Sequence, residues 1–160
     1  MYYYIVAALP YLDISGTVEM DVEGFLEFTG SMLGEKDFAV LDAVRRGDPS
    51  AHPFLASALG FRAELASELA RNRAAALGSD AGQHRSASNA RMAEKARQLA
   101  GMENPFEAEI ALMSYIWEYL DDLESGHFFD LQRLVIYLLK LELLQRKNML
   151  TEERGTARYA

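Results

Sequence analysis

Apolar residues recur at helical spacing along most of the chain, and this pattern predicts an all-α fold. Polar or glycine-containing breaks separate the apolar stripes into six segments. The predicted helices cover residues 22 to about 33, 36–46, 53–77, 90–100, 105–124 and 128–147. We find no internal repeat, and we expect one helical domain over residues 1–160.

Several helix ends carry recognisable local signals. Asp21 is suited to accept orphan backbone N–H groups as an N-cap. Asn104, Pro105 and Glu107 combine a cap, a proline at the first helical position and a capping-box carboxylate. The run from Gly47 to Ser50 interrupts the helical pattern. Residues from about 78 to 88 are small and polar, which favours a mobile loop.

The last third of the chain holds the two strongest helices, and we expect residues 104–147 to form a central helical hairpin. The first of them has a broad apolar stripe that includes Ile110, Met113 and Trp117. The second is apolar around most of its circumference, which exceeds what one stripe needs. Such a helix lies in the centre of a bundle or carries a protein interface.

The beginning of the chain is ambiguous. Residues 2–6 favour a strand by propensity, but the same residues fit the first turns of a helix that ends before Pro10. No second good strand is available to pair with it. A helix, or an extended segment packed on helices, is therefore the better interpretation.

Composition and charge narrow the function classes. The chain has no cysteine, so disulfides, thiol nucleophiles and cysteine-based metal sites are excluded. Its formal net charge is −8, which argues against nucleic-acid binding. Its apolar runs are too short to cross a membrane, so we expect a soluble, cytoplasmic protein without direct membrane insertion.

The middle of the chain differs in charge from its ends. Residues 52–101 carry a net charge of +3, whereas the segments before and after carry −6 and −5. The simpler explanation is two amphipathic helices with basic outer faces, and the alternative is a docking surface for an acidic protein. The basic residues concerned are Arg62, Arg71, Arg73, Arg85, Arg91, Lys95 and Arg97.

Few residue patterns suggest chemistry. Glu124 and His127 have the E-x-x-H spacing of helical di-iron sites, but a complete site needs a second such pair and two further glutamates. No phosphate-binding glycine loop and no nucleophile elbow occurs. We therefore expect no catalytic residues, no metal site and no cofactor.

Several segments resemble a small bacterial family whose genes occur in operons of V-type ATPases, which transport protons or sodium ions. The resemblance covers nearly the whole chain. Its segments are residues 2–10, 25–28, 59–78 with Arg62 and Glu64, 104–109 and 126–131. More distantly, the leucine-rich last helix followed by residues 151–155 is similar to the central-stalk subunit called C or d, which is all-helical and non-catalytic.

The resemblance implies a subunit or an accessory or assembly factor that binds V-type ATPase subunits, in the cytoplasm or at the membrane periphery through that complex. Our candidate interface residues are Arg62, Arg71, Arg73, Phe128 and Phe129. Two alternatives remain open. One is a small-ligand-binding bundle with a pocket lined by Tyr115, Trp117 and Tyr119, and the other is an enzyme that uses Glu124 and His127.

Overall fold

The protein is all-helical, as the sequence predicts, and is described by a computed structural model over residues 1–78 and 90–159. Within these ranges no strand occurs. The elements in chain order are α1 (Tyr2–Ala8), α2 (Val22–Gly30), α3 (Glu35–Arg46), the 3₁₀ turn η1 (Pro49–Ala51), α4 (Pro53–Ala76), α5 (Ala90–Ala100), α6 (Pro105–Glu124) and α7 (Leu131–Tyr159).

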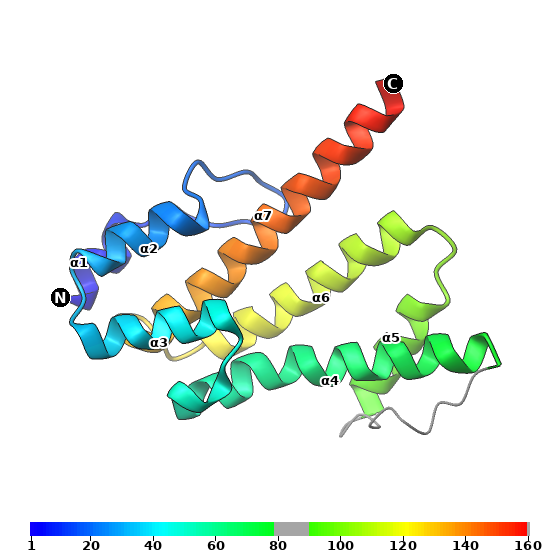
Figure 1. Cartoon of the computed structure of the whole chain (residues 1–160), viewed down its shortest axis with the longest axis horizontal. Helices are drawn as coiled ribbons and strands as arrows, with labels where there is room; N and C mark the ends of the chain where they lie inside the picture. Colours follow the sequence, from blue (N-terminus) through cyan, green and yellow to red (C-terminus); the bar gives the residue numbers. More distant parts are fainter. Residues whose placement is uncertain (79–89, 160) are drawn as a thin grey trace.

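Helix α7 is the centre of the bundle (Figure 1). It contacts α1, α2 and α3 on one side and α6 on the other, while α4 and α5 pack together and against α6. The C-terminal end of α7 extends beyond the other helices in Figure 1. Because α7 has neighbours on several sides, its apolar residues around most of the circumference are used for packing.

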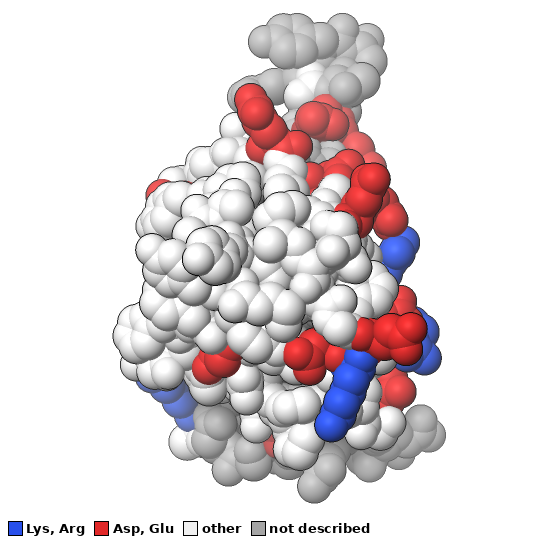
Figure 2. Space-filling view, turned by 90° about the vertical axis from the view of Figure 1, so that its left-hand side faces the viewer, with Lys and Arg blue, Asp and Glu red and all other residues white. Residues whose placement is uncertain are grey.

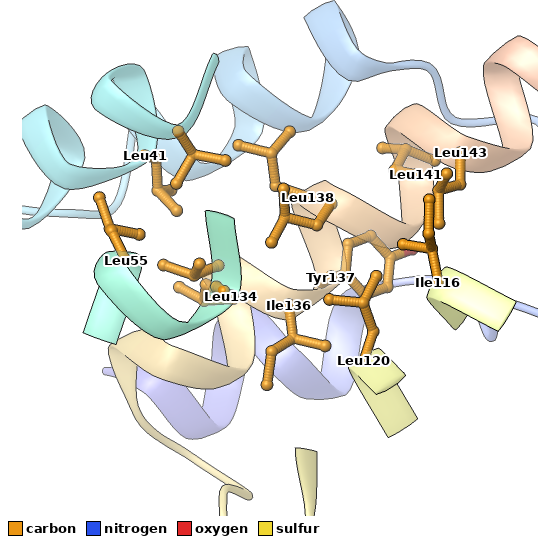
Figure 3. Packing of buried hydrophobic residues seen from close by; sticks show 14 of the residues in the cluster. Leu41, Leu55, Ile116, Leu120, Leu134, Ile136, Tyr137, Leu138, Leu141 and Leu143 are labelled. Atoms are coloured by element: carbon orange, nitrogen blue, oxygen red, sulfur yellow. The ribbon is translucent and has the colours of Figure 1, made fainter. Parts of the chain in front are cut away.

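The core surrounds the N-terminal third of α7, where Leu134, Ile136, Leu138 and Leu139 are fully buried. Figure 3 shows side chains from α3, α4 and α6 converging on this stretch; those labelled are Leu41, Leu55, Ile116 and Leu120. A fully buried leucine or isoleucine contributes roughly 1.5–3 kcal/mol relative to an exposed one. A large part of the folding free energy therefore depends on α7.

Most predicted helix ends are close to the observed ones because local caps define them. The Asp21 carboxylate accepts a hydrogen bond from the Gly24 N–H at 2.7 Å. The Asn104 side chain accepts from the N–H groups of Phe106 and Glu107 at 3.0 and 3.4 Å. Gly47 ends α3 with φ 70°, a left-handed conformation that favours glycine.

The predicted bounds of the last helix are wrong at both ends. Gly126 has φ 87°, and the Asp130 carboxylate accepts from the Arg133 N–H at 2.9 Å, so α7 begins at Leu131 and not at Phe128. At the other end α7 continues past Lys147 along the start of α6, where Arg154 lies 4.1 Å from the centre of the Phe106 ring. Tertiary contacts thus support the additional turns.

Three further points concern the N-terminal half. Residues 2–8 are helical, so the extended alternative does not apply there. Helix α2 ends at Gly30, three residues before the expected end, and Gly34 then precedes α3 in an extended conformation. The loop expected at about 78–88 lies, apart from Gly78, outside the described residues.

None of the helices in the described part of the chain combines the length and apolar character that a membrane span requires.

Candidate functional site

An exposed aromatic patch lies where α1 meets the segment between α6 and α7. We define it by Tyr3, Tyr4, Phe128 and Phe129, all of which are exposed, with Phe128 at 67% and Phe129 at 52%. The ring centres of Tyr3 and Phe129 are 5.0 Å apart, and those of Tyr3 and Tyr4 are 5.6 Å apart. Adjacent exposed rings of this kind are typical of interaction surfaces.

The side of the molecule near the N-terminus is poor in charge. Figure 2 shows a wide surface there without Lys, Arg, Asp or Glu, with acidic side chains gathered along one edge. For a chain of net charge −8, such a surface is unusual. It is the kind of face on which a partner can bind without desolvating charged groups.

A groove of about 570 Å³ lies between the segment after α1, helix α6 and helix α7. Its apolar lining includes Leu9, Leu12, Ile14 and Trp117. Its charged lining consists of Asp13, Glu118, Asp121, Glu124, Arg133 and Lys140. The groove therefore combines an aromatic and aliphatic surface with ionic groups at close range.

The two groove cations are already paired. Lys140 is only 7% exposed, and its ammonium donates to Asp121 at 2.5 Å and to Glu124. Arg133 pairs with Glu124 as well. The Lys140 ammonium also lies 5.1 Å from the centre of the Trp117 ring, a cation–π geometry. This network joins α6 to α7 and offsets the acidic residues at the C-terminal end of α6, where the helix dipole disfavours negative charge.

The outer wall of the groove is the segment after α1, which is held on α7 by two hydrogen bonds. The Tyr137 hydroxyl donates to the Pro10 carbonyl at 2.7 Å, and Lys147 donates to the Ile14 carbonyl. Burial raises the pKa of Tyr137 to about 12. Hydrogen bonds from the backbone and side chain of Ser15 lower the pKa of Asp13, so this carboxyl is ionised at neutral pH.

Glu124 and His127 do not form one site, despite their spacing. Glu124 binds the two cations of α7, whereas His127 Nδ1 is 2.7 Å from Asp130, the residue that caps α7. The His127 ring also packs against Phe54. No group of His, Asp or Glu suited to hold a metal ion occurs among the residues that the structure describes.

The predicted basic interface residues lie apart from the aromatic patch. Arg62 pairs with Glu142 of α7 at 3.8 Å, Arg71 pairs with the buried Glu68, and Arg73 is exposed. The N-terminal end of α4 contacts His127, next to the patch. At a rise of 1.5 Å per helical residue, Arg71 lies about 25 Å along α4 from Phe54, the residue that contacts His127. Sequence reasoning therefore grouped residues that belong to two surfaces.

The three aromatic residues expected to line one pocket are also separated. Trp117 lines the groove, but Tyr119 stacks on Phe61 at 3.7 Å and donates to the Ser57 carbonyl. Tyr115 lines a smaller hollow of about 280 Å³ beside Lys95. Residues two positions apart on an α-helix point about 200° away from each other, so Trp117 faces away from Tyr115 and Tyr119.

Sequence reasoning missed the ionic network and the groove. The available signal was Lys140, a lysine within the most apolar run of the chain, because a buried ammonium needs an acidic partner. Comparison of the chain with protein-family models, with curated proteins and with solved structures finds no match. Function is therefore inferred from the site itself and from the resemblance of the sequence segments.

Proposed function

We propose that this chain is a non-catalytic protein-interaction component, a subunit or accessory factor of a V-type rotary ATPase. The observation that supports it best is the exposed aromatic patch, in which the Tyr3 ring contacts those of Tyr4 and Phe129 beside a surface of low charge. Aromatic residues are enriched among the few positions that contribute most of the binding energy at interfaces. The resemblance of the segments around residues 104–109 and 126–131 suggests the complex.

The test is affinity purification of the tagged chain from its native cell, with the ATPase subunits measured by quantitative mass spectrometry. We compare the wild type with Phe129→Ala and with the matched control Met149→Ala. Both side chains are about half exposed, at 52% and 55%, but Met149 lies on α7 outside the patch.

We expect ATPase subunits to be recovered with the wild type and with Met149→Ala. Recovery with Phe129→Ala is expected to fall strongly, since truncating an interface hot spot costs about 2 kcal/mol or more. Absence of ATPase subunits from the wild-type sample would contradict the proposed complex. Equal recovery with the two variants would contradict the role of the patch.

A second candidate is a small-ligand-binding bundle, and the groove supports it. Its volume of about 570 Å³ lies within the range of ligand sites, and Trp117 lines it. Native mass spectrometry of the chain purified from its own cell tests this candidate. A bound small molecule that is lost when Ser114→Phe fills the groove would support it, and a spectrum of the unliganded chain alone would remove it.

A further inference from the structure

The charges of the groove do not balance, and this imbalance indicates what the groove binds. Lys140 and Arg133 are neutralised by Asp121 and Glu124. Two further carboxylates, those of Asp13 and Glu118, line the groove without a groove cation within ion-pair distance among the described residues. Lys147 acts electrostatically on Asp13, and Glu118 also borders the smaller hollow that Arg91 and Lys95 line. Neither carboxylate belongs to an ion pair among the described residues, so the lining of the groove itself has two acidic groups in excess.

The excess carboxylates lie on different walls. Asp13 belongs to the segment after α1, whereas Glu118 is an exposed residue of α6. Apolar side chains that include Leu12 and Trp117 line the same groove. An occupant that matches this lining has apolar side chains for the groove and cationic side chains for its rims.

We propose that the groove binds a short basic amphipathic segment of a partner protein, with lysine or arginine paired to Glu118 and Asp13 and an apolar side chain against Trp117. A volume of about 570 Å³ accepts a few side chains of a segment but no folded domain. The inference depends on the proposed protein-interaction role, but neither on the aromatic patch nor on the identity of the complex.

Trp117 makes the proposal directly measurable, because it is the single tryptophan of the chain and it lines the groove. The probe is a synthetic amphipathic peptide of leucine and lysine, titrated into the full chain while Trp117 emission is recorded. The control peptide has glutamate in place of every lysine. Neither peptide contains an aromatic residue, so any change in emission comes from the chain.

The matched variants are Glu118→Lys in the groove and Glu27→Lys on α2. Both glutamates are exposed and both substitutions change the net charge equally, but Glu27 does not line the groove. We expect the lysine peptide to change Trp117 emission saturably. We expect Glu118→Lys to weaken its binding about tenfold and Glu27→Lys to weaken it less than about twofold.

Three results would overturn the inference. The first is that Trp117 emission does not change when the lysine peptide is added. The second is that Glu118→Lys and Glu27→Lys weaken peptide binding equally, which would indicate diffuse attraction to an acidic protein. The third is that the glutamate peptide binds as tightly as the lysine peptide. Phe129→Ala leaves the groove lining intact and is expected to leave this titration unchanged. The groove and the aromatic patch are thus tested separately, and the failure of one is distinguishable from the failure of the other.

Discussion

Replacing Lys140 by methionine tests whether the ionic network contributes to folding. Methionine keeps the unbranched apolar stem but removes the ammonium that pairs with Asp121 and Glu124. Breaking a fully buried ion pair typically costs about 3–5 kcal/mol, because the remaining charge stays buried without compensation. The cost here is reduced for two reasons. Glu124 keeps Arg133 as a partner, and the Asp121 side chain, which is 54% exposed, can be solvated.

We therefore expect Lys140→Met to lower the free energy of unfolding by about 2–3 kcal/mol. Urea unfolding followed by circular dichroism measures it, and the midpoint is expected to fall by roughly 1 M. Arg46→Met is the matched control. Arg46 pairs with Asp42 at 3.1 Å on the surface, so its loss is expected to cost less than about 0.5 kcal/mol.

The double variant Lys140→Met/Asp121→Asn tests the carboxylate that the lost ammonium leaves without a partner. Glu124 keeps Arg133, whereas Asp121 has no other ion-pair partner among the described residues. A neutral amide needs no cation, so we expect the double variant to recover about 0.5 kcal/mol or less relative to Lys140→Met, because Asp121 is already half exposed. The reasoning is refuted if Lys140→Met costs no more than Arg46→Met, since the network would then behave as solvated surface pairs.

Two further predictions concern α7. Leu138→Asp is expected to unfold the chain, because Leu138 is fully buried and a carboxylate would have no partner there. The control Met149→Asp changes a position that is 55% exposed and is expected to be tolerated. Thermal unfolding distinguishes the two variants, and an unchanged midpoint for Leu138→Asp would contradict a buried α7. Tyr137 keeps its proton up to about pH 12 in the folded chain, while the unfolded chain releases it near pH 10. Stability is therefore expected to fall by up to about 2 kcal/mol between these values. Tyr137→Phe should lessen this alkaline loss while costing about 1 kcal/mol at neutral pH. Urea unfolding at several pH values measures both effects, and an identical alkaline loss in the variant would rule out Tyr137 as its cause.

The sequence by itself determined the helical class and most helix ends, because the responsible interactions are local. A cap such as Asn104 needs only the backbone of the next few residues, and Gly47 needs only its own freedom to adopt a positive φ. The C-terminal end of α7 is not predictable from local sequence, because the last turns contact Phe106, a residue far away in the chain. The start of α7 was misjudged because Asp130 acts as a cap in a segment that is also rich in apolar residues.

The surfaces were decided only by the tertiary structure. The sequence identifies Phe129 as a candidate interface residue, but its contact with Tyr3 joins residues that are far apart in the chain. The groove likewise requires the segment after α1 to be held on α7 by Tyr137. Helical periodicity reports which residues are apolar and which face they share, since this follows from the backbone alone. Which faces meet depends on packing between distant segments, and that arrangement places Lys140 beside its acidic partners and leaves Glu118 and the aromatic patch at the surface.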